Sequence, residues 1–274
     1  MLSGKRFTRE AIGYSDLRTT LLGIDATLGV PGFPQSATGQ ASIFTGENAA
    51  ALLGSHLSGF PDQTLRQLLS AKGMFKKIRK NGYRASFANT YRPPFFDLLR
   101  KGLPGNRYSC STLIAYYGGL PFNGLNELKQ GRALFMDITN EVLQRMGFDV
   151  PLITPEEGAQ RLLKISKNYD FCMFEYFLTD LAGHLGDEAE ASRVISILDR
   201  FVGTIANQVD TEDTLLLVTS DHGNLEDPSN RFHTLNQVPV LLVGPAELRH
   251  RLVSNMTDLT DLLPAIQSIL EWHR

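Results

Sequence analysis

The 274-residue sequence is 42% hydrophobic and 20% charged, with a formal net charge of -2. This length and composition are typical of one large α/β core, alone or with a small insertion. A nearly neutral chain has no general electrostatic attraction to nucleic acid or anionic membranes, so neither partner is expected. The N-terminus does not resemble a signal peptide, and no apolar run approaches the roughly 18 to 20 residues that span a bilayer. A cytoplasmic protein is therefore expected. Cys110 and Cys172 form no CxxC pattern, so neither a disulfide framework nor a cysteine-based zinc site is predicted.

The first third of the chain predicts a short strand followed by helices. An apolar segment at 21–24 precedes a proline-rich loop, and residues 35–46 predict a loop that enters a helix ending at glycine, with Ser36 near its N-terminus. Residues 64–81 have a helical rhythm that ends at Asn81-Gly82, which is typical of a C-cap. The basic residues in its last turns fit a solvated helix end that complements the helix dipole better than a nucleic-acid site.

Residues 91–165 differ in composition from the segments on either side. Proline and glycine pairs divide the first part into short pieces, and a helix is predicted after them at about 125–146. Thr154-Pro155-Glu156-Glu157 predicts the start of a second helix, which leads back to the sheet. We therefore predict a metal-binding α/β core formed by residues 1–90 and 166–274, and a cap-like helical insertion formed by residues 91–165.

The second half of the chain alternates strands and helices. Residues 170–178, 215–218 and 238–243 predict strands, 188–207 predict an amphipathic helix, and 259–272 the last helix. Parallel pairing with right-handed crossovers is the default for this order. The predicted fold is α/β, with a mainly parallel sheet that has helices on both faces.

Polar residues that could meet at one edge of this sheet follow three of the predicted elements. They are Ser36, then Asp180 with His184, then Asp221-His222 with His233. Carboxylate and imidazole together suit Zn²⁺ or Mn²⁺ better than Ca²⁺, which prefers oxygen ligands alone. Two such sets suggest two ions.

Each of these residues also has a structural interpretation. Asp180 could cap a helix, His184 could lie on a polar turn, and Asp221 to Asn224 could form a turn stabilised by its own side chains. Ser36 could be a plain helix cap. The joint pattern favours a metal site, because both histidine-bearing stretches directly follow apolar runs.

Three stretches carry a resemblance to a known family: Gln35-Ser36-Ala37-Thr38-Gly39-Gln40, Asp180-Leu181-Ala182-Gly183-His184, and Ser220-Asp221-His222-Gly223-Asn224 with His233-Thr234. In spacing and order the chain resembles the alkaline phosphatase superfamily. It is most similar to the metalloenzyme branch that includes cofactor-independent phosphoglycerate mutase and phosphopentomutase.

The resemblance implies metal-dependent phosphoryl transfer on a small phosphorylated substrate, as a phosphatase or a phosphomutase. It implies that Asp180, His184 and His233 hold one divalent ion, and that Asp221 and His222 help to hold a second beside the nucleophile Ser36. Thr38 is the weaker candidate for the nucleophile. A bound cation stabilises a serine alkoxide, which is otherwise a weak nucleophile at neutral pH.

Two departures from the family pattern qualify these implications. No Asp-Gly motif at the end of a first strand precedes Ser36, so we expect the first strand and its metal ligand to be missing and the Asp180/His184/His233 site to be the better occupied. Gln40 stands where the mutases have histidine. The alternative function is that of a catalytically weak or inactive metal-binding homologue with an interaction or regulatory role.

The substrate-binding residues cannot be assigned from the sequence. Four basic residues of the insertion are candidate phosphate contacts, but each is better explained as a plain surface charge: Arg92, Arg100, Lys101 and Arg107.

Overall fold

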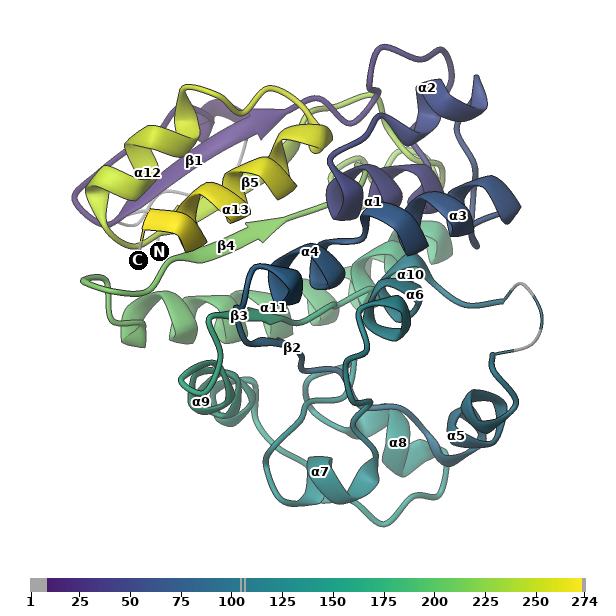
Figure 1. Cartoon of the computed structure of the whole chain (residues 1–274). Coiled ribbons are helices and arrows are strands. Elements are labelled where there is room, and N and C mark those ends of the chain that lie inside the picture. The colour runs from purple at the N-terminus through teal and green to yellow at the C-terminus, as the bar shows by residue number, and fades with distance from the viewer. Residues whose placement is uncertain (1–8, 104, 106, 273–274) are drawn as a thin grey trace.

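The computed structural model describes residues 9–103, 105 and 107–272, and its strands form two separate small sheets. The first has the order β1 (Thr19–Ile24), β5 (Val238–Val243), β4 (Leu216–Thr219). The second pairs β2 (Ala85–Phe87) with β3 (Phe171–Met173). Figure 1 shows β3 and β2 beyond β4, on the side of β4 that faces away from β5.

The strand pairings differ from the mainly parallel sheet that the sequence predicted. β5 is antiparallel to both β1 and β4, and only β2 and β3 are parallel. A parallel return normally requires a crossover helix, whereas the loop between β4 and β5, residues 220–237, contains no helix. The chain can therefore turn back directly, and β5 runs against β4.

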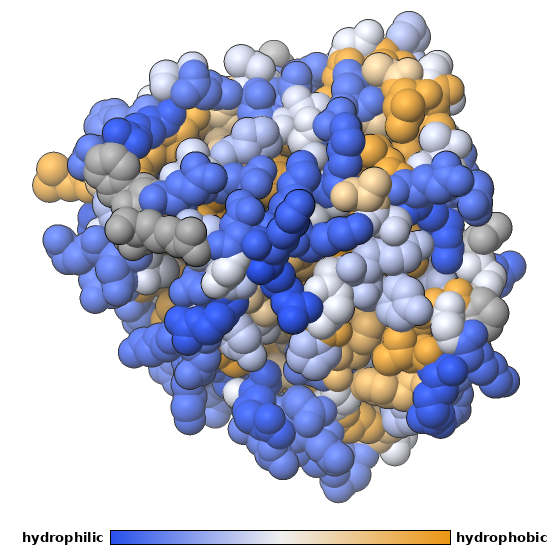
Figure 2. All heavy atoms as spheres, in the orientation of Figure 1, coloured by the Kyte–Doolittle hydropathy of each residue, from blue (hydrophilic) through white to orange (hydrophobic). Residues whose placement is uncertain are grey.

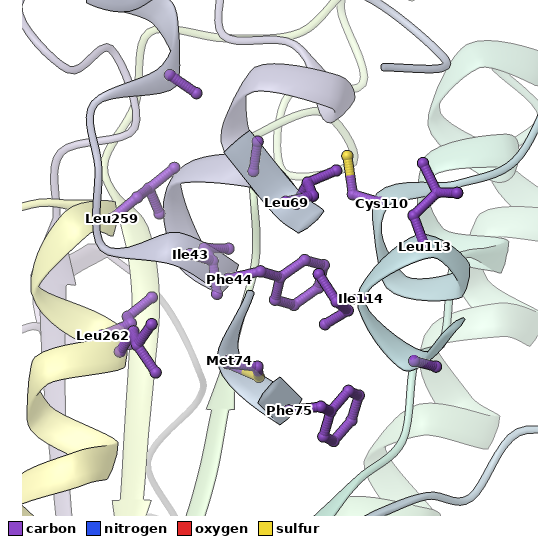
Figure 3. Close-up of a cluster of buried hydrophobic side chains, with 14 of the residues drawn as sticks. Ile43, Phe44, Leu69, Met74, Phe75, Cys110, Leu113, Ile114, Leu259 and Leu262 are labelled. Carbon is purple, nitrogen blue, oxygen red and sulfur yellow. The ribbon is translucent and has the colours of Figure 1, made fainter. Parts of the chain in front are cut away.

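Two apolar clusters cover opposite faces of the three-stranded sheet. Alternate side chains point to opposite faces of a strand, and in β4 Leu217 packs in the first cluster while Leu216 and Val218 pack in the second. Helices α1 (Ser36–Thr45), α3 (Gln63–Lys72), α4 (Met74–Lys80) and α13 (Leu262–Trp272) contribute to the first cluster, part of which is shown in Figure 3. Helices α9 (Pro155–Ser166) and α11 (Glu188–Gln208) contribute to the second.

Most predicted helices are present, but two are interrupted. The helix predicted at 64–81 is broken at Gly73, whose φ of -57° and ψ of 140° are not helical, and it gives α3 and α4. The helix predicted at 125–146 is reduced to α7 (Leu125–Lys129) and α8 (Glu141–Arg145). The predicted helix start at Thr154 is confirmed, because the Thr154 hydroxyl accepts from the Glu157 amide and the Glu157 carboxylate accepts from the Thr154 amide.

The remaining helices are short. They are η1 (Arg9–Ala11), α2 (Ala49–Leu53), α5 (Pro93–Arg100), α6 (Cys110–Tyr117), α10 (Leu178–Leu185), α12 (Ala246–Val253) and η2 (Leu259–Asp261). The predicted insertion has two parts: a small cluster around Leu128, Phe135 and Leu143 is formed by the insertion alone, whereas α6 packs in the first core cluster through Leu113 and Ile114. The domain boundaries stay a prediction.

The face of the molecule shown in Figure 2 is mostly polar. On the face of Figure 2, apolar atoms gather over the α2 corner, where Leu52 is exposed. Within the described residues, no helix combines the length and the apolar character that crossing a membrane requires.

Candidate metal centre and nucleophile

Three elements bring the predicted site residues together: the first turn of α1, helix α10, and the loop that follows β4. The sequence placed Asp180 and His184 at the end of a strand over 170–178. In the structure β3 ends at Met173, and both residues lie on α10, where their i,i+4 spacing puts them on one helix face. A helix thus carries this pair toward the loop that holds the other ligand candidates.

Ser36 is the first residue of α1 and lies beside His222. The Ser36 Oγ and His222 Nε2 atoms are 2.9 Å apart. The Thr38 hydroxyl, by contrast, donates to the Gln35 carbonyl at 3.1 Å, and the Thr38 side chain is buried. Of the two hydroxyls, that of Ser36 faces the histidine cluster.

Asp180, His184 and His233 form a compact triangle of ligand atoms. The Asp180 Oδ1 atom lies 3.3 Å from His184 Nε2 and 3.4 Å from His233 Nε2, and the two Nε2 atoms are 3.1 Å apart. Ligands at the usual 2.0 to 2.2 Å from a tetrahedral zinc lie roughly 3.3 to 3.6 Å from one another. The triangle therefore has nearly the dimensions of one face of such a site.

The backbone fixes which nitrogen atoms of these histidines face each other. The Nδ1 atom of His184 lies 2.7 Å from the Arg231 carbonyl oxygen, and Nδ1 of His233 lies 2.6 Å from that of Pro34. Carbonyl oxygens only accept, so each Nδ1 carries a proton that it donates, and in the neutral rings both Nε2 lone pairs point into the triangle. Histidine ligands of metal ions are commonly held in this way.

His222 joins this cluster and is not set apart in a second one. Its ring stacks on that of His233 at 3.6 Å between centroids, and its Nε2 lies 3.8 Å from Asp180 Oδ1. Asp180, His222 and His233 offer ligand atoms within 4.8 Å of one another. Among the described residues, the buried atoms Asp180 Oδ1 and His222 Nδ1 have no hydrogen-bond partner. Buried polar atoms without partners are costly, and this cluster fits the binding of a divalent metal ion.

Asp221 lies at the inner end of the cluster, with its Oδ2 atom 3.7 Å from His222 Nε2. Burial raises the pKa of Asp221, against the opposing effect of His222. Burial would also raise the pKa of Asp180, but the nearby His233, His222 and His184 outweigh it and lower that pKa. Asp25, which precedes Ser36 in the sequence, instead accepts hydrogen bonds from the Thr27 amide and hydroxyl.

Glu226 was not predicted from the sequence. It forms hydrogen bonds that link the two halves of the loop of residues 220–237, here called the ligand loop. Its carboxylate accepts from the Asn224 amide at 2.7 Å, from Asn236 Nδ2 at 3.2 Å, and from the Thr234 hydroxyl. An antiparallel bridge between Gly223 and Thr234 runs beside it. The loop is thereby held with His222 and His233 face to face, and no local sequence signal marks Glu226.

A second missed group is the network around Glu175. The Ser111 hydroxyl donates to Glu175 Oε2 at 2.6 Å, and Gln40 Nε2 donates to Oε1 at 3.3 Å. Burial raises the pKa of Glu175 to about 7, and the charge of Asp221 acts in the same direction. The residue lay within a predicted buried strand, and its contacts with Ser111 and Gln40 were not foreseen.

The four basic residues of the insertion lie apart from the cavity that contains Ser36 and Asp221, since none of them lines it. Arg100 pairs with Asp97, and Arg92 Nη1 lies 3.3 Å from the Met146 sulfur. A role in substrate binding stays a prediction for all four, including Lys101 and Arg107.

Comparison with known proteins identifies related chains. The Metalloenzyme superfamily model matches residues 142–271, which carry five of the six candidate site residues. The 2,3-bisphosphoglycerate-independent phosphoglycerate mutase of Thermococcus kodakarensis is 27% identical over 158 residues, 53% of this chain and 38% of that protein. The protein of the same name from Rhodopseudomonas palustris is 27% identical over 248 residues, 82% of this chain and 46% of that protein.

Two solved structures are also similar. A phosphoglycerate mutase of Leishmania mexicana matches with a TM-score of 0.44 and 16% identity over 73% of this chain and 37% of that one. A cold-active alkaline phosphatase from Shewanella sp. matches with a TM-score of 0.44 and 14% identity over 99% of this chain and 83% of that one. The chain spans less than half the length of the two curated relatives described above.

Proposed function

Because the chain belongs to the metalloenzyme superfamily, we propose that it transfers the phosphoryl group of a small phosphate ester, as a phosphatase or a phosphomutase, with Ser36 as the nucleophile. The observation that carries the proposal is the contact of 2.9 Å between the Ser36 hydroxyl and His222 Nε2, within a cluster of one carboxylate and stacked histidines. A nucleophile placed beside metal ligands is what in-line phosphoryl transfer requires.

The ligand candidates divide between two ions in this proposal. Asp180, His184 and His233 would hold one Zn²⁺ or Mn²⁺ ion, and Asp221 and His222 would hold the other beside Ser36. Such ions, when bound, stabilise a serine alkoxide and the negative charge of the phosphoryl group. The Arg231 and Pro34 carbonyls keep the Nε2 atoms of His184 and His233 free to bind.

The reaction forms and breaks one bond at phosphorus. The Ser36 hydroxyl releases its proton to water, its oxygen forms a bond to phosphorus, and the bond from phosphorus to the ester oxygen breaks. The alcohol leaves with that electron pair and takes up a proton from water. Water or a second hydroxyl group then removes the phosphoryl group from Ser36, which gives the phosphatase or the mutase outcome. The N-terminus of α1 supports the step, because its backbone N–H groups attract phosphate oxygens.

Turnover of p-nitrophenyl phosphate, measured with added Zn²⁺ or Mn²⁺, tests the proposal. Wild type is expected to release p-nitrophenol. Ser36→Ala should reduce the rate by roughly 10³-fold or more while metal binding is retained, because the ligand atoms are untouched. Ser55→Ala, at an exposed position, is the matched control. A Ser36→Ala variant as active as wild type contradicts the assignment of the nucleophile.

A second candidate function is that of a metal-binding homologue with little or no activity. It is favoured by the ligand count at the inner position, because among the described residues His222 groups with Asp180 and His233, whereas Asp221 belongs to no group of three ligand atoms and lies 3.7 Å from His222 Nε2. Binding of two ions per chain together with turnover of p-nitrophenyl phosphate would exclude this second candidate.

A further inference from the structure

Gln40 lies one helical turn after Ser36 on α1 and has no role in the proposed function. The i,i+4 spacing puts both side chains on one face of the helix, and both line the cavity that contains Asp221. Helix α1 also approaches Asp221 closely, because a methyl group on Gly39 would meet the Asp221 carbonyl oxygen at 2.5 Å. The helix that carries the proposed nucleophile therefore lies directly against a candidate ligand of the ion beside Ser36, here called the inner ion.

The side-chain amide of Gln40 faces two partly buried carboxylates. Its Nε2 atom donates to Glu175 Oε1 at 3.3 Å. Burial raises the pKa of Asp221, whereas His222 and a hydrogen bond from the Gln40 side chain lower it. Ionised carboxylates only accept hydrogen bonds, so the NH₂ end of the amide, with its two N–H donors, faces both groups. A single glutamine thus links Glu175 to Asp221.

Glu175 is itself held in place through its side chain and its backbone. The Ser111 hydroxyl donates to its Oε2 atom at 2.6 Å. The Glu175 amide donates to Asn89 Oδ1 at 2.9 Å, and the Glu175 carbonyl accepts from Asn89 Nδ2 at 2.8 Å. Ser111 lies on α6, which contacts α1 where the Cys110 Sγ donates to the Ala37 carbonyl at 3.4 Å. The Glu175 carboxylate is therefore a fixed acceptor for the glutamine amide.

We propose that Gln40 is a positioning residue for the inner ion: its amide orients the Asp221 carboxylate, and Glu175 fixes the orientation of that amide. The proposal rests on the assignment of Asp221 as a metal ligand in the proposed function. A carboxylate can rotate about its side-chain bonds, and hydrogen bonds from neighbouring groups hold ligating carboxylates in one orientation. Gln40 touches no reacting atom in this role and acts through Asp221.

The two ions should depend on this orientation to different degrees. The inner ion has Asp221 and His222 as its candidate ligands, so the direction of one carboxylate affects half of them. The ion of Asp180, His184 and His233, here called the outer ion, has three ligand atoms that already lie close together. Loss of the glutamine amide should therefore weaken the binding of the inner ion and leave the outer ion unchanged.

Isothermal titration of the full, metal-free chain with Zn²⁺ tests the proposal without any measurement of turnover. Gln40→Met keeps the length of the side chain and removes both N–H donors. The first ion should bind as tightly as it does to wild type, and the affinity for the second should fall by roughly 10- to 100-fold. Gln67→Met, at an exposed position of α3, is the matched control and should bind both ions as wild type does.

Two substitutions of Glu175 distinguish positioning from direct metal binding. In Glu175→Gln the new amide oxygen can still accept from Gln40, while its nitrogen donates to the Ser111 hydroxyl, so the second ion should bind nearly as in wild type. Glu175→Ala removes the acceptor and should weaken the second ion as Gln40→Met does. If Glu175→Gln loses the second ion as fully as Glu175→Ala, Glu175 is a ligand and the proposal is overturned.

The Gln40→Met variant can overturn the proposal in two ways. Its affinity for the second ion may equal that of wild type, which excludes a positioning role. Both ions may instead be weakened together, which would indicate a general change in the fold. A wild-type chain that binds a single ion at saturating Zn²⁺ overturns the ligand assignment on which the proposal rests. The role of Ser36 is decided separately, by the turnover of Ser36→Ala.

Discussion

Gly183 lies against Asn224 so closely that a methyl group on Gly183 would meet the Asn224 Oδ1 atom at 1.3 Å. Gly183 is on α10, between Asp180 and His184, and Asn224 is two residues after His222. The glycine therefore sets how near the α10 ligands come to those of the loop. Buried Asn224 has no side-chain partner in the described structure, so it fills this contact by shape alone.

Gly183→Ala is expected to weaken Zn²⁺ binding by roughly 10- to 100-fold, because it moves α10 away from the ligand loop. Isothermal titration with Zn²⁺ measures the effect. Leu181→Ala, at an exposed position of the same helix, should bind as wild type does. The double variant Gly183→Ala/Asn224→Ala removes the overlapping atoms and should recover most of the affinity. An unchanged affinity in Gly183→Ala would show that α10 does not contribute ligands.

Glu226→Gln tests whether the hydrogen bonds of the Glu226 carboxylate within the ligand loop position the histidines. The amide replaces one acceptor oxygen by a donor, so at least one of the Asn224 amide, the Thr234 hydroxyl and the Asn236 side chain loses its partner. We expect Zn²⁺ affinity to fall by roughly 10-fold, although Glu226 is not a ligand. Glu247→Gln, on an exposed part of α12, is the control. Equal affinities in both variants would argue against a positioning role.

The sequence was most informative where one local rule dominates. The amphipathic pattern of 188–207 predicted α11 almost to the residue, and the capping box at Thr154 predicted the start of α9. It was wrong where aromatic residues suit either a buried strand or a contact with a helix. Phe174 and Tyr176 extended the predicted strand to residue 178, but β3 ends at Met173 and the chain continues into α10. Both aromatic side chains pack against helix α11. Burial by tertiary contacts decided that boundary, and the local pattern could not show it.

The sequence identified the candidate site residues but not how they group, and their roles as ligands and nucleophile stay predictions. Short motifs identified the carboxylates and histidines, because their chemistry is local. The stacking of His222 on His233 depends on a loop closed by Glu226, eight residues before Thr234. Likewise, the Pro34 carbonyl that orients His233 lies 199 residues away in the sequence. Such contacts follow from the assembled fold, and no spacing rule contains them.

Arg249 is expected to be a stability determinant remote from the site. Its side chain is 1% exposed, and its guanidinium donates to the carbonyls of Gly244, Asp16 and Leu17 and to the Thr20 hydroxyl. Arg249→Met should lower the free energy of unfolding by about 2 to 4 kcal/mol, because several buried acceptors lose their donors. Urea denaturation measures the loss, with exposed Lys80→Met as control. A loss no greater than that of the control contradicts the prediction.

The raised pKa of Glu175 leads us to expect that its contribution to the stability of the folded state is greater at acid pH than at neutral pH. Its pKa is raised by burial to about 7 from an ordinary 4.5. Its contribution to stability is thus fully present below about pH 4.5 and is lost as the pH rises through 7. The shift in the pKa of Glu175 corresponds to a loss on the order of 3 kcal/mol. This figure is an upper limit, because Glu175 borders a cavity that admits water. Urea unfolding between pH 4.5 and 8 should show it, and Glu175→Gln should flatten that part of the profile.

The two proposed metal positions should differ in affinity. Asp180, His184 and His233 provide three ligand atoms with separations of 3.1 to 3.4 Å, whereas the inner position has only Asp221 and His222, 3.7 Å apart. We expect one tightly bound Zn²⁺ per chain. His233→Ala should remove that ion, and Asp221→Asn, which keeps the size of the side chain, should retain it. Elemental analysis after gel filtration measures both, and circular dichroism checks that each variant is folded. Equal loss of zinc in the two variants would mean that the ligands act as a single shared site.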